Sequence, residues 1–185
     1  RMCPHFHLPL QSGSNTVLRD MRRRYTTETY LSQVERIYQF LPSASITADL
    51  IVGFPTEGER EFEETYRFCQ DLDLANIHVF PYSVRPGTTA AHVPPKQNSV
   101  EKKNRTKTML KLASQKATDF RKRSFGSIHS VLWEKSDLSR DKAYIGLTDN
   151  YLRVRCVSAE DLTNTTTLVR LGIEEDRAIN CEIIS

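Results

Sequence analysis

The first half of the chain alternates between two patterns of apolar residues. Three short runs are rich in β-branched and aromatic residues, as expected for strands, and two longer runs between them repeat apolar residues every three or four positions, as expected for helices. The strand-like runs are residues 5–10, 45–54 and 76–82, and the helix-like runs are residues 27–41 and 59–72. This order predicts a βαβαβ arrangement with helices flanking a parallel sheet.

Caps support the two helices. Thr27 and Thr56 stand where each helical pattern begins, and Glu59, three residues after Thr56, completes a capping-box pattern. Three strands are too few to close a parallel barrel, which takes eight, and an open sheet exposes its edges and one face. We therefore expect a partial barrel, with a small complete α/β domain as the alternative.

The second half of the chain has a different texture. A loop rich in Pro and Gly covers residues 83–95 and ends the sheet region. One long helix is predicted for residues 99–123, and five short strand candidates follow it: residues 128–134, 144–147, 151–157, 166–171 and 178–184. Their number and spacing predict a small antiparallel barrel of OB-like size. The expected fold is therefore α/β plus all-β, divided into residues 1–95, 96–124 and 125–185.

Composition limits the class of protein. Apolar residues make up 38% of the 185, and none of their runs approaches the roughly 18 needed to cross a membrane. A cytoplasmic protein without a membrane partner is expected. The four cysteines, Cys3, Cys69, Cys156 and Cys181, are scattered, which favours reduced and mostly buried thiols. Cys3, His5 and His7 alternate, and metal ligation by one strand face is an alternative for them.

Polar residues gather where the predicted strands end, which is where parallel α/β architectures bind ligands. Three groups are candidates for a nucleoside site, because they combine hydrogen-bonding groups, close backbone approach, carboxylates, aromatic faces and a cation. They are Gln11, Ser12 and Gly13; Asp49, Gly53 and Glu57; and Phe80, Tyr82 and Arg85. The structural alternatives are a helix-capping turn for the first group, a solvated helix start for Glu57 and core packing for Phe80.

Basic residues are concentrated on the long helix. Residues 99–124 hold nine Lys or Arg against two acids, an imbalance that a merely solvated helix face rarely has and that suits a polyanion. Aromatic and basic residues of the small barrel suit looped RNA. The predicted RNA-binding residues are Arg22, Arg23, Arg24, Lys102, Lys103, Lys107, Lys111, Arg121, Lys122, Arg123, Tyr151, Arg153 and Arg155.

Five motifs in this order resemble the methylthiotransferases of the radical S-adenosylmethionine superfamily. They are His7-Leu-Pro-Leu-Gln-Ser-Gly-Ser14, Met21-Arg-Arg-Arg-Tyr25, Asp49-Leu-Ile-Val-Gly-Phe-Pro55, Phe62-Glu-Glu-Thr65 and His78-Val-Phe-Pro-Tyr-Ser-Val-Arg-Pro-Gly-Thr88. The segment from about residue 125 resembles the TRAM domain of those enzymes. The runs around His78 and Thr148 are most similar to the branch that acts on threonylcarbamoyladenosine in tRNA.

The resemblance implies the C-terminal half of an enzyme that adds a 2-methylthio group to a modified adenosine beside the anticodon. It implies S-adenosylmethionine as cofactor, contacted by the three groups of strand-end residues, and two [4Fe-4S] clusters in the parent protein. The chain has no C-x3-C-x2-C run, so no catalytic or metal-binding residue is expected in it and activity of the fragment alone is not expected. tRNA is the expected partner.

Two other functions remain open on sequence alone. An RNA-binding module would use only the basic helix and the small barrel, and a radical enzyme that modifies a ribosomal protein would share the first two motifs. Self-association through the open sheet edge is a further alternative.

Overall fold

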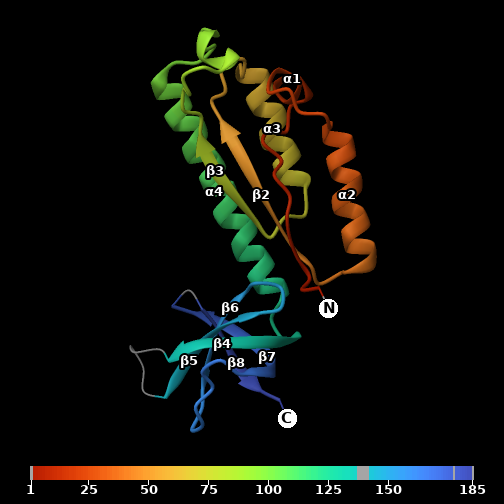
Figure 1. The fold of residues 1–185 in the computed structure, drawn as a ribbon, viewed down its shortest axis with the longest axis vertical. Helices are drawn as coiled ribbons and strands as arrows, with labels where there is room; N and C mark the ends of the chain where they lie inside the picture. The colour runs from red at the N-terminus through yellow and green to blue at the C-terminus, as the bar shows by residue number, and fades with distance from the viewer. Residues whose placement is uncertain (1, 137–141, 177, 185) are drawn as a thin grey trace. The chain divides into compact units, whose positions relative to one another are not determined.

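The computed structural model describes residues 2–136, 142–176 and 178–184 of the chain. These residues form two compact units, drawn in Figure 1. The sheet unit comprises Phe6–Pro42 and Ile46–Ala117, and the barrel unit comprises the remaining described residues. Helix α4 (Ser99–Arg123) contributes residues to both units.

A parallel three-stranded sheet forms the centre of the sheet unit, in the order β1-β2-β3. The elements before α4 are β1 (His5–His7), α1 (Asn15–Asp20), α2 (Thr27–Phe40), β2 (Ser45–Val52), α3 (Glu59–Asp71), β3 (Asn76–Pro81) and the short 3-10 helix η1 (Thr89–His92). Strands β2 and β3 run in parallel, with Thr47 opposite Asn76 and Val52 opposite Pro81. The predicted βαβαβ order is confirmed, with the short helix α1 as an addition.

Helices cover one face of this sheet. Ile46, Ala48, Leu50 and Val52 alternate along β2 and have no exposed surface. Their core also includes side chains of α2, α3 and α4, which lie beside the sheet in Figure 1. Full burial of a Leu or Ile side chain contributes about 1.5–3 kcal/mol, so this row of residues anchors β2 as the central strand.

The opposite face of the sheet is polar and partly exposed. The side chains of His7 and Asp49 keep 42% and 29% of their surface, and Nε2 of His7 lies 3.3 Å from Oδ2 of Asp49. The His7 ring also lies beside that of His78, with 5.9 Å between centroids. Along β2, apolar residues therefore point to the face that the helices cover, and alternate polar residues point to the open face.

Both predicted helix starts are shifted. Thr26, rather than Thr27, caps α2 by accepting a hydrogen bond from the backbone N–H of Thr29. Helix α3 begins at Glu59 with Gly58 at its N-cap, and the Gly58 N–H donates to Oε2 of Glu61. The capping box predicted from Thr56 is wrong, because two further residues are used to leave the strand before the helix begins.

The barrel unit holds a closed five-stranded barrel in the order β4-β5-β6-β8-β7. Its strands are β4 (Ile128–Ser136), β5 (Ala143–Thr148), β6 (Arg153–Val157), β7 (Thr166–Glu175) and β8 (Ala178–Ile183). The predicted small closed barrel is confirmed. It is not wholly antiparallel, because β6 pairs with β8 in parallel and the sheet is therefore mixed.

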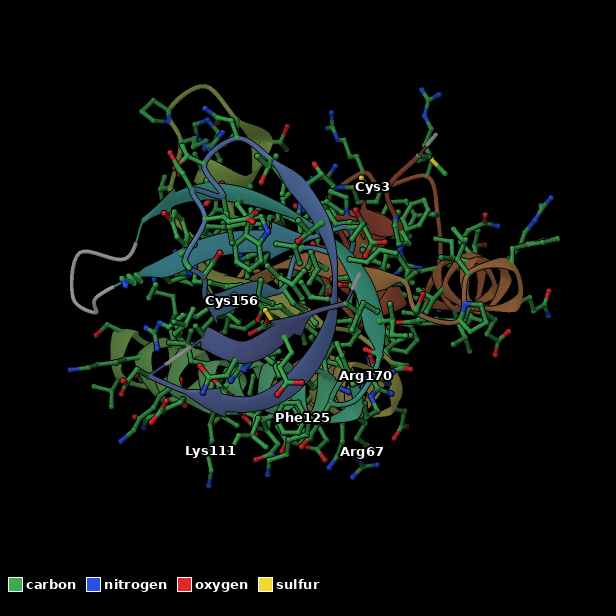
Figure 2. All side chains as sticks on the ribbon, turned by 90° about the horizontal axis from the view of Figure 1, so that it is seen from below. Cys3, Arg67, Lys111, Phe125, Cys156 and Arg170 are labelled. Atoms are coloured by element: carbon green, nitrogen blue, oxygen red, sulfur yellow. The ribbon has the colours of Figure 1, made fainter. Side chains whose placement is uncertain are left out.

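Apolar side chains and one tryptophan fill the barrel. Trp133, Val131 and Val154 have no exposed surface, and the Trp133 indole N–H donates to Oγ1 of Thr167 at 2.9 Å. Cys156 also points inside the ring of strands in Figure 2. As predicted, Cys69, Cys156 and Cys181 are buried free thiols, whereas Cys3 is exposed. Within the described residues, no helix has the length and apolarity required to cross a membrane.

Gly146 on β5 provides a test of the barrel packing. A Cβ at this position would lie 2.5 Å from the Leu132 carbonyl oxygen and 3.0 Å from the Trp133 ring. We expect Gly146→Ala to destabilise the barrel by about 1–3 kcal/mol through overpacking. Fluorescence of the single tryptophan during urea unfolding reports this unit, and Thr166→Ala on the exposed surface is the control. Equal midpoints for the two variants would contradict the packing.

Candidate functional site

A cavity of about 840 Å³ opens at the carboxyl ends of the three parallel strands. It lies entirely within the sheet unit. It is lined by Gln11, Asp20, Met21, Arg22, Arg23, Asp49, Ile51, Phe54, Phe80, Pro81, Tyr82, Ser83, Arg85, Gly87, Thr88, Thr89 and Ala90. Its volume falls in the range of about 300–1,000 Å³ that is usual for small-molecule sites.

Gln11 reaches the cavity from an unusual backbone conformation. Its φ angle is 67°, in the left-handed region that side chains rarely adopt. Its N–H donates to the Asp49 carbonyl and its own carbonyl accepts from the Ile51 N–H, at 2.8 and 2.9 Å. Its side-chain Oε1 accepts a 2.9 Å hydrogen bond from Arg23. Strand β2 therefore holds Gln11 in a strained geometry that presents its amide to the cavity.

Asp49 belongs to β2 itself and faces away from the helices. Besides its contact with His7, it shares the cavity wall with Ile51, two residues further along the same face of the strand. Because the carboxylate is partly exposed and has one side in contact with a histidine, its remaining oxygen surface can accept hydrogen bonds from hydroxyl or amino groups of a ligand.

Aromatic side chains form the wall that β3 contributes. Phe80 is 51% exposed, and the ring of Tyr82 packs edge-on against Phe54, with 5.2 Å between centroids. Arg85 follows in the loop, where its carbonyl accepts hydrogen bonds from the N–H and the hydroxyl of Thr88. The core-packing alternative for Phe80 is wrong, because half of its surface faces the cavity and solvent.

Ser12 and Gly13 lie behind the cavity wall instead of on it. Oγ of Ser12 lies 3.3 Å from Oγ1 of Thr65 on α3, and the Gly13 N–H donates to the same hydroxyl. A Cβ on Gly13 would lie 2.8 Å from the Thr65 Cα. Gly13 therefore permits close approach of helix α3, where the sequence suggested close approach of a ligand.

Gly53 and Glu57 also support the cavity from behind. Gly53 has a φ of 79°, and the Lys102 stem lies where its Cβ would be. Glu57 has no exposed surface, and its Oε1 accepts from the Gly53 N–H at 3.0 Å. Burial raises the pKa of Glu57, and the hydrogen bond from Gly53 and the Arg105 guanidinium oppose that shift. The Glu57 carboxyl thus fixes the turn after β2.

Arg105 of α4 completes this buried cluster. Its guanidinium donates to the carbonyl and Oε1 of Glu57 at 3.0 and 3.3 Å, and to Oε2 of Glu59 at 2.8 Å. The Cζ atom of Arg105 also lies 5.2 Å from the centre of the Phe62 ring. One of the basic residues that gave α4 its charge excess therefore points into the sheet unit.

Two arginines predicted to bind RNA lie on the cavity. Arg22 has a φ of 59° and donates from Nη2 to Oγ1 of Thr89 at 3.3 Å. Arg23 contacts Gln11, and Arg24 is exposed outside the cavity lining. No binding role was predicted for Asp20 or for residues 87–90, which also line the cavity. Their position after strand ends was the available signal, since loops at that edge share one space.

The remaining cations of α4 divide into two sets. Lys102 donates to the Tyr82 carbonyl, Lys116 to carbonyls of Gln70 and Leu72, and Arg121 pairs with Glu174. The exposed set is Lys103, Lys107, Lys111, Lys122 and Arg123. Lys111 points away from the ribbon in Figure 2. The first three repeat every four residues, so they form a stripe on one helix face.

The predicted RNA-binding residues of the barrel differ in exposure. Tyr151 is 60% exposed and Arg153 is exposed, whereas Arg155 is only 8% exposed. The structure therefore leaves Arg153 and one face of the Tyr151 ring accessible to a partner, because the other ring face stacks on His5 with 4.2 Å between centroids, and it leaves little of the Arg155 side chain exposed. Strand alternation predicts that Arg153 and Arg155 share one face of β6, opposite to that of Val154. The sequence did not indicate that Arg155 would be buried while Arg153 is exposed.

Comparison with known proteins adds independent information. The profile of the Radical SAM superfamily matches residues 2–69. Over 169 residues, 90% of this chain, the sequence is 36% identical to threonylcarbamoyladenosine tRNA methylthiotransferase MtaB of Bacillus subtilis, and over 156 residues, 84% of the chain, it is 39% identical to the protein of the same name from Aquifex aeolicus. The chain belongs to the radical S-adenosylmethionine methylthiotransferase family.

A third relative carries a different name within this family. Over 170 residues, 92% of the chain, the sequence is 34% identical to tRNA-2-methylthio-N(6)-dimethylallyladenosine synthase of Protochlamydia amoebophila. The chain spans 36% to 38% of the length of these three methylthiotransferases. The region that matches this chain is therefore one part of a longer protein in each relative.

The two cofactors implied by the family fit this chain differently. The cavity suits the charged nucleoside S-adenosylmethionine, since it combines carboxylates, guanidinium groups and aromatic faces. An iron–sulfur cluster requires grouped thiolates, and the described residues include no group of three His, Cys, Asp or Glu side chains that could hold a metal. This criterion also disfavours the alternative in which Cys3, His5 and His7 bind a metal.

The Arg105 cluster generates a test of how α4 supports the site. We expect Arg105→Met to lower the free energy of unfolding by about 3–5 kcal/mol, because it leaves the buried Glu57 carboxylate without its cation. Far-ultraviolet circular dichroism during urea unfolding follows the helices of the sheet unit. Lys103→Met, an exposed change on the same helix, is the control.

A second substitution distinguishes the ion pair from general packing. Glu57→Gln combined with Arg105→Met removes both buried charges, so it should be more stable than Arg105→Met alone. A double variant as unstable as the single one would show that the ion pair does not determine the effect.

Proposed function

We propose that this chain is part of a tRNA methylthiotransferase that installs a 2-methylthio group on N6-threonylcarbamoyladenosine next to the anticodon. The observation that carries the proposal is the convergence of Gln11, Asp49 and Tyr82 on one cavity, at the strand edge where the family motifs lie. The names of the Bacillus subtilis and Aquifex aeolicus relatives support the threonylcarbamoyl substrate.

In this proposal the cavity residues hold S-adenosylmethionine. Tyr82 and Phe80 offer aromatic surface to the adenine, and Asp49 accepts hydrogen bonds from hydroxyl groups of the ribose or from the ammonium group. Gln11, fixed by β2 and Arg23, donates and accepts beside them. Ser12, Gly13, Gly53 and Glu57 keep these side chains in place from behind. The cofactor supplies one-electron chemistry when bound, and the protein groups of this chain bind and orient it.

We further propose that tRNA is the macromolecular partner. The stripe of Lys103, Lys107 and Lys111 offers cations at regular intervals to a phosphate backbone. The barrel fits the small TRAM domain that the family motifs suggested, and its exposed Tyr151 and Arg153 supply a stacking surface and a cation. In this view, residues 1–95 form the C-terminal part of the radical S-adenosylmethionine barrel, residues 96–124 a basic linker helix and residues 125–185 the RNA-binding TRAM domain.

A chimera tests the activity. The region of the Bacillus subtilis relative that precedes its match to this chain is joined to residues 1–185 and expressed in cells that lack the relative. We expect 2-methylthio-N6-threonylcarbamoyladenosine in digested tRNA, detected by mass spectrometry. Asp49→Asn in the chimera should lower its formation about tenfold or more, the size of one lost charge-assisted hydrogen bond.

Asp71→Asn, an exposed change on α3, removes the same charge and is the matched control. Formation of the 2-methylthio derivative of dimethylallyladenosine instead would reassign the substrate. An inactive chimera that still binds tRNA would favour the RNA-binding module.

Salt dependence tests the RNA surface separately. The 185-residue chain should bind a tRNA anticodon stem-loop at low salt, and the logarithm of its affinity should fall linearly with the logarithm of salt concentration. Changing Lys103, Lys107 and Lys111 to Gln should reduce that slope by about 2–3, because each phosphate contact contributes about 0.7–0.9. The control changes Arg36, Arg60 and Arg67 to Gln. An identical slope in both variants would exclude the α4 stripe.

A further inference from the structure

The cavity contains more guanidinium groups than its own acids engage. Arg22, Arg23 and Arg85 all line it, and within the described residues none of them forms an ion pair with a carboxylate. The two acids of the lining are Asp20 and Asp49, and Asp49 is in contact with His7. A cavity with spare guanidinium groups is suited to a ligand that brings its own anion.

The three arginines are not equivalent. Arg23 donates to Gln11 and so serves the cavity wall. Arg22 and Arg85 instead belong to one rim: Arg22 donates to Thr89, and the Arg85 carbonyl accepts from Thr88, the residue next to Thr89. A left-handed φ of 59° at Arg22 costs backbone free energy, and such strain is typical of residues held in place for a ligand.

The names of the relatives contain two modified adenosines, and only one of the two modifications carries an anionic group. Threonylcarbamoyl ends in a carboxylate, whereas dimethylallyl is a hydrocarbon without charge. Guanidinium groups recognise carboxylates through two parallel hydrogen bonds, and hydrogen bonds to charged groups contribute about 1.5–3 kcal/mol. Binding of one carboxylate at the rim would therefore separate the two substrates without any change in how the adenine itself is held.

We propose that Arg22 and Arg85 bind the carboxylate of the N6-threonylcarbamoyl group and are the specificity-determining residues of the site. The inference rests on the proposed function and goes one step further, because it assigns substrate choice to two residues of the cavity rim. Two competing sources of the anion are the carboxylate of S-adenosylmethionine, which would leave the three arginines indifferent to the tRNA substrate, and a phosphate of the RNA backbone, which would be bound equally in every tRNA.

Three synthetic anticodon stem-loops of the same sequence separate these sources. One carries N6-threonylcarbamoyladenosine, the second its methyl ester, and the third N6-dimethylallyladenosine. Dissociation constants for the 185-residue chain are measured by fluorescence anisotropy at fixed salt. The chain should bind the free carboxylate about tenfold or more tightly than the ester and the hydrocarbon, as expected for one charge-assisted contact.

The variants assign the preference to residues. Arg85→Gln and the double change Arg22→Gln with Arg85→Gln should remove the preference and leave binding of the ester and the hydrocarbon nearly unchanged. Arg24→Gln, the exposed neighbour outside the cavity, removes one charge but should retain the preference. Circular dichroism spectra matching the unchanged chain show that each variant is folded, and Arg85→Gln, in an exposed loop, is informative even if the double variant unfolds.

Each remaining result counts against the proposal. Equal affinity of the unchanged chain for the three RNAs would overturn carboxylate recognition, while the proposed tRNA function would stand. An equal loss of affinity for all three RNAs in Arg85→Gln would assign the arginine to phosphate. No binding of any RNA at low salt would overturn the proposed function together with the inference.

Discussion

Parallel pairing of β2 with its neighbours is the constraint on which the rest of the sheet unit depends. Because the three strands run in the same direction, the segments that follow them meet at one edge. Side chains from distant parts of the sequence, such as Gln11, Asp49 and Tyr82, therefore line one cavity. The fully buried side chains of Ile46, Ala48, Leu50 and Val52 fix β2 against the helices. The positions between them, such as Asp49, point to the other face of the sheet and are left to form the site.

The buried cluster of Glu57 and Arg105 extends this constraint to helix α4. A carboxylate without exposed surface is unfavourable unless it is compensated, and Glu57 obtains compensation from the Gly53 N–H and the Arg105 guanidinium. The turn after β2 is consequently tied to a helix more than forty residues away in sequence. The exposed lysine stripe and the arginine that fixes the turn behind the cavity thus share one helix, whose inner face is structural and whose outer face is available to a partner.

The sequence predicted the order of elements well, because that order follows from local periodicity, and through the strand-end rule it pointed to the sheet edge at which the cavity lies. It predicted individual roles less well. Arg105 and Lys107 look alike in a charge count, but one is buried and the other exposed. Arg22 and Arg23 were predicted to bind RNA, and the turn before α2 places both of them at the cavity, which the sequence did not indicate. Such differences depend on tertiary packing, which neither composition nor spacing specifies.

At this site the glycines are required for space, and residues with long side chains adopt the left-handed backbone conformation. Gly13 and Gly53 are small because helix α3 and the Lys102 stem occupy the space beside them. Gln11 and Arg22, which carry long side chains, adopt the left-handed backbone that usually favours glycine. Strand β2 supplies two backbone hydrogen bonds that hold Gln11 there. Glycine at either position would relieve the strain but would remove the amide or the guanidinium from the cavity, so a polar side chain in a strained conformation is what a binding role requires.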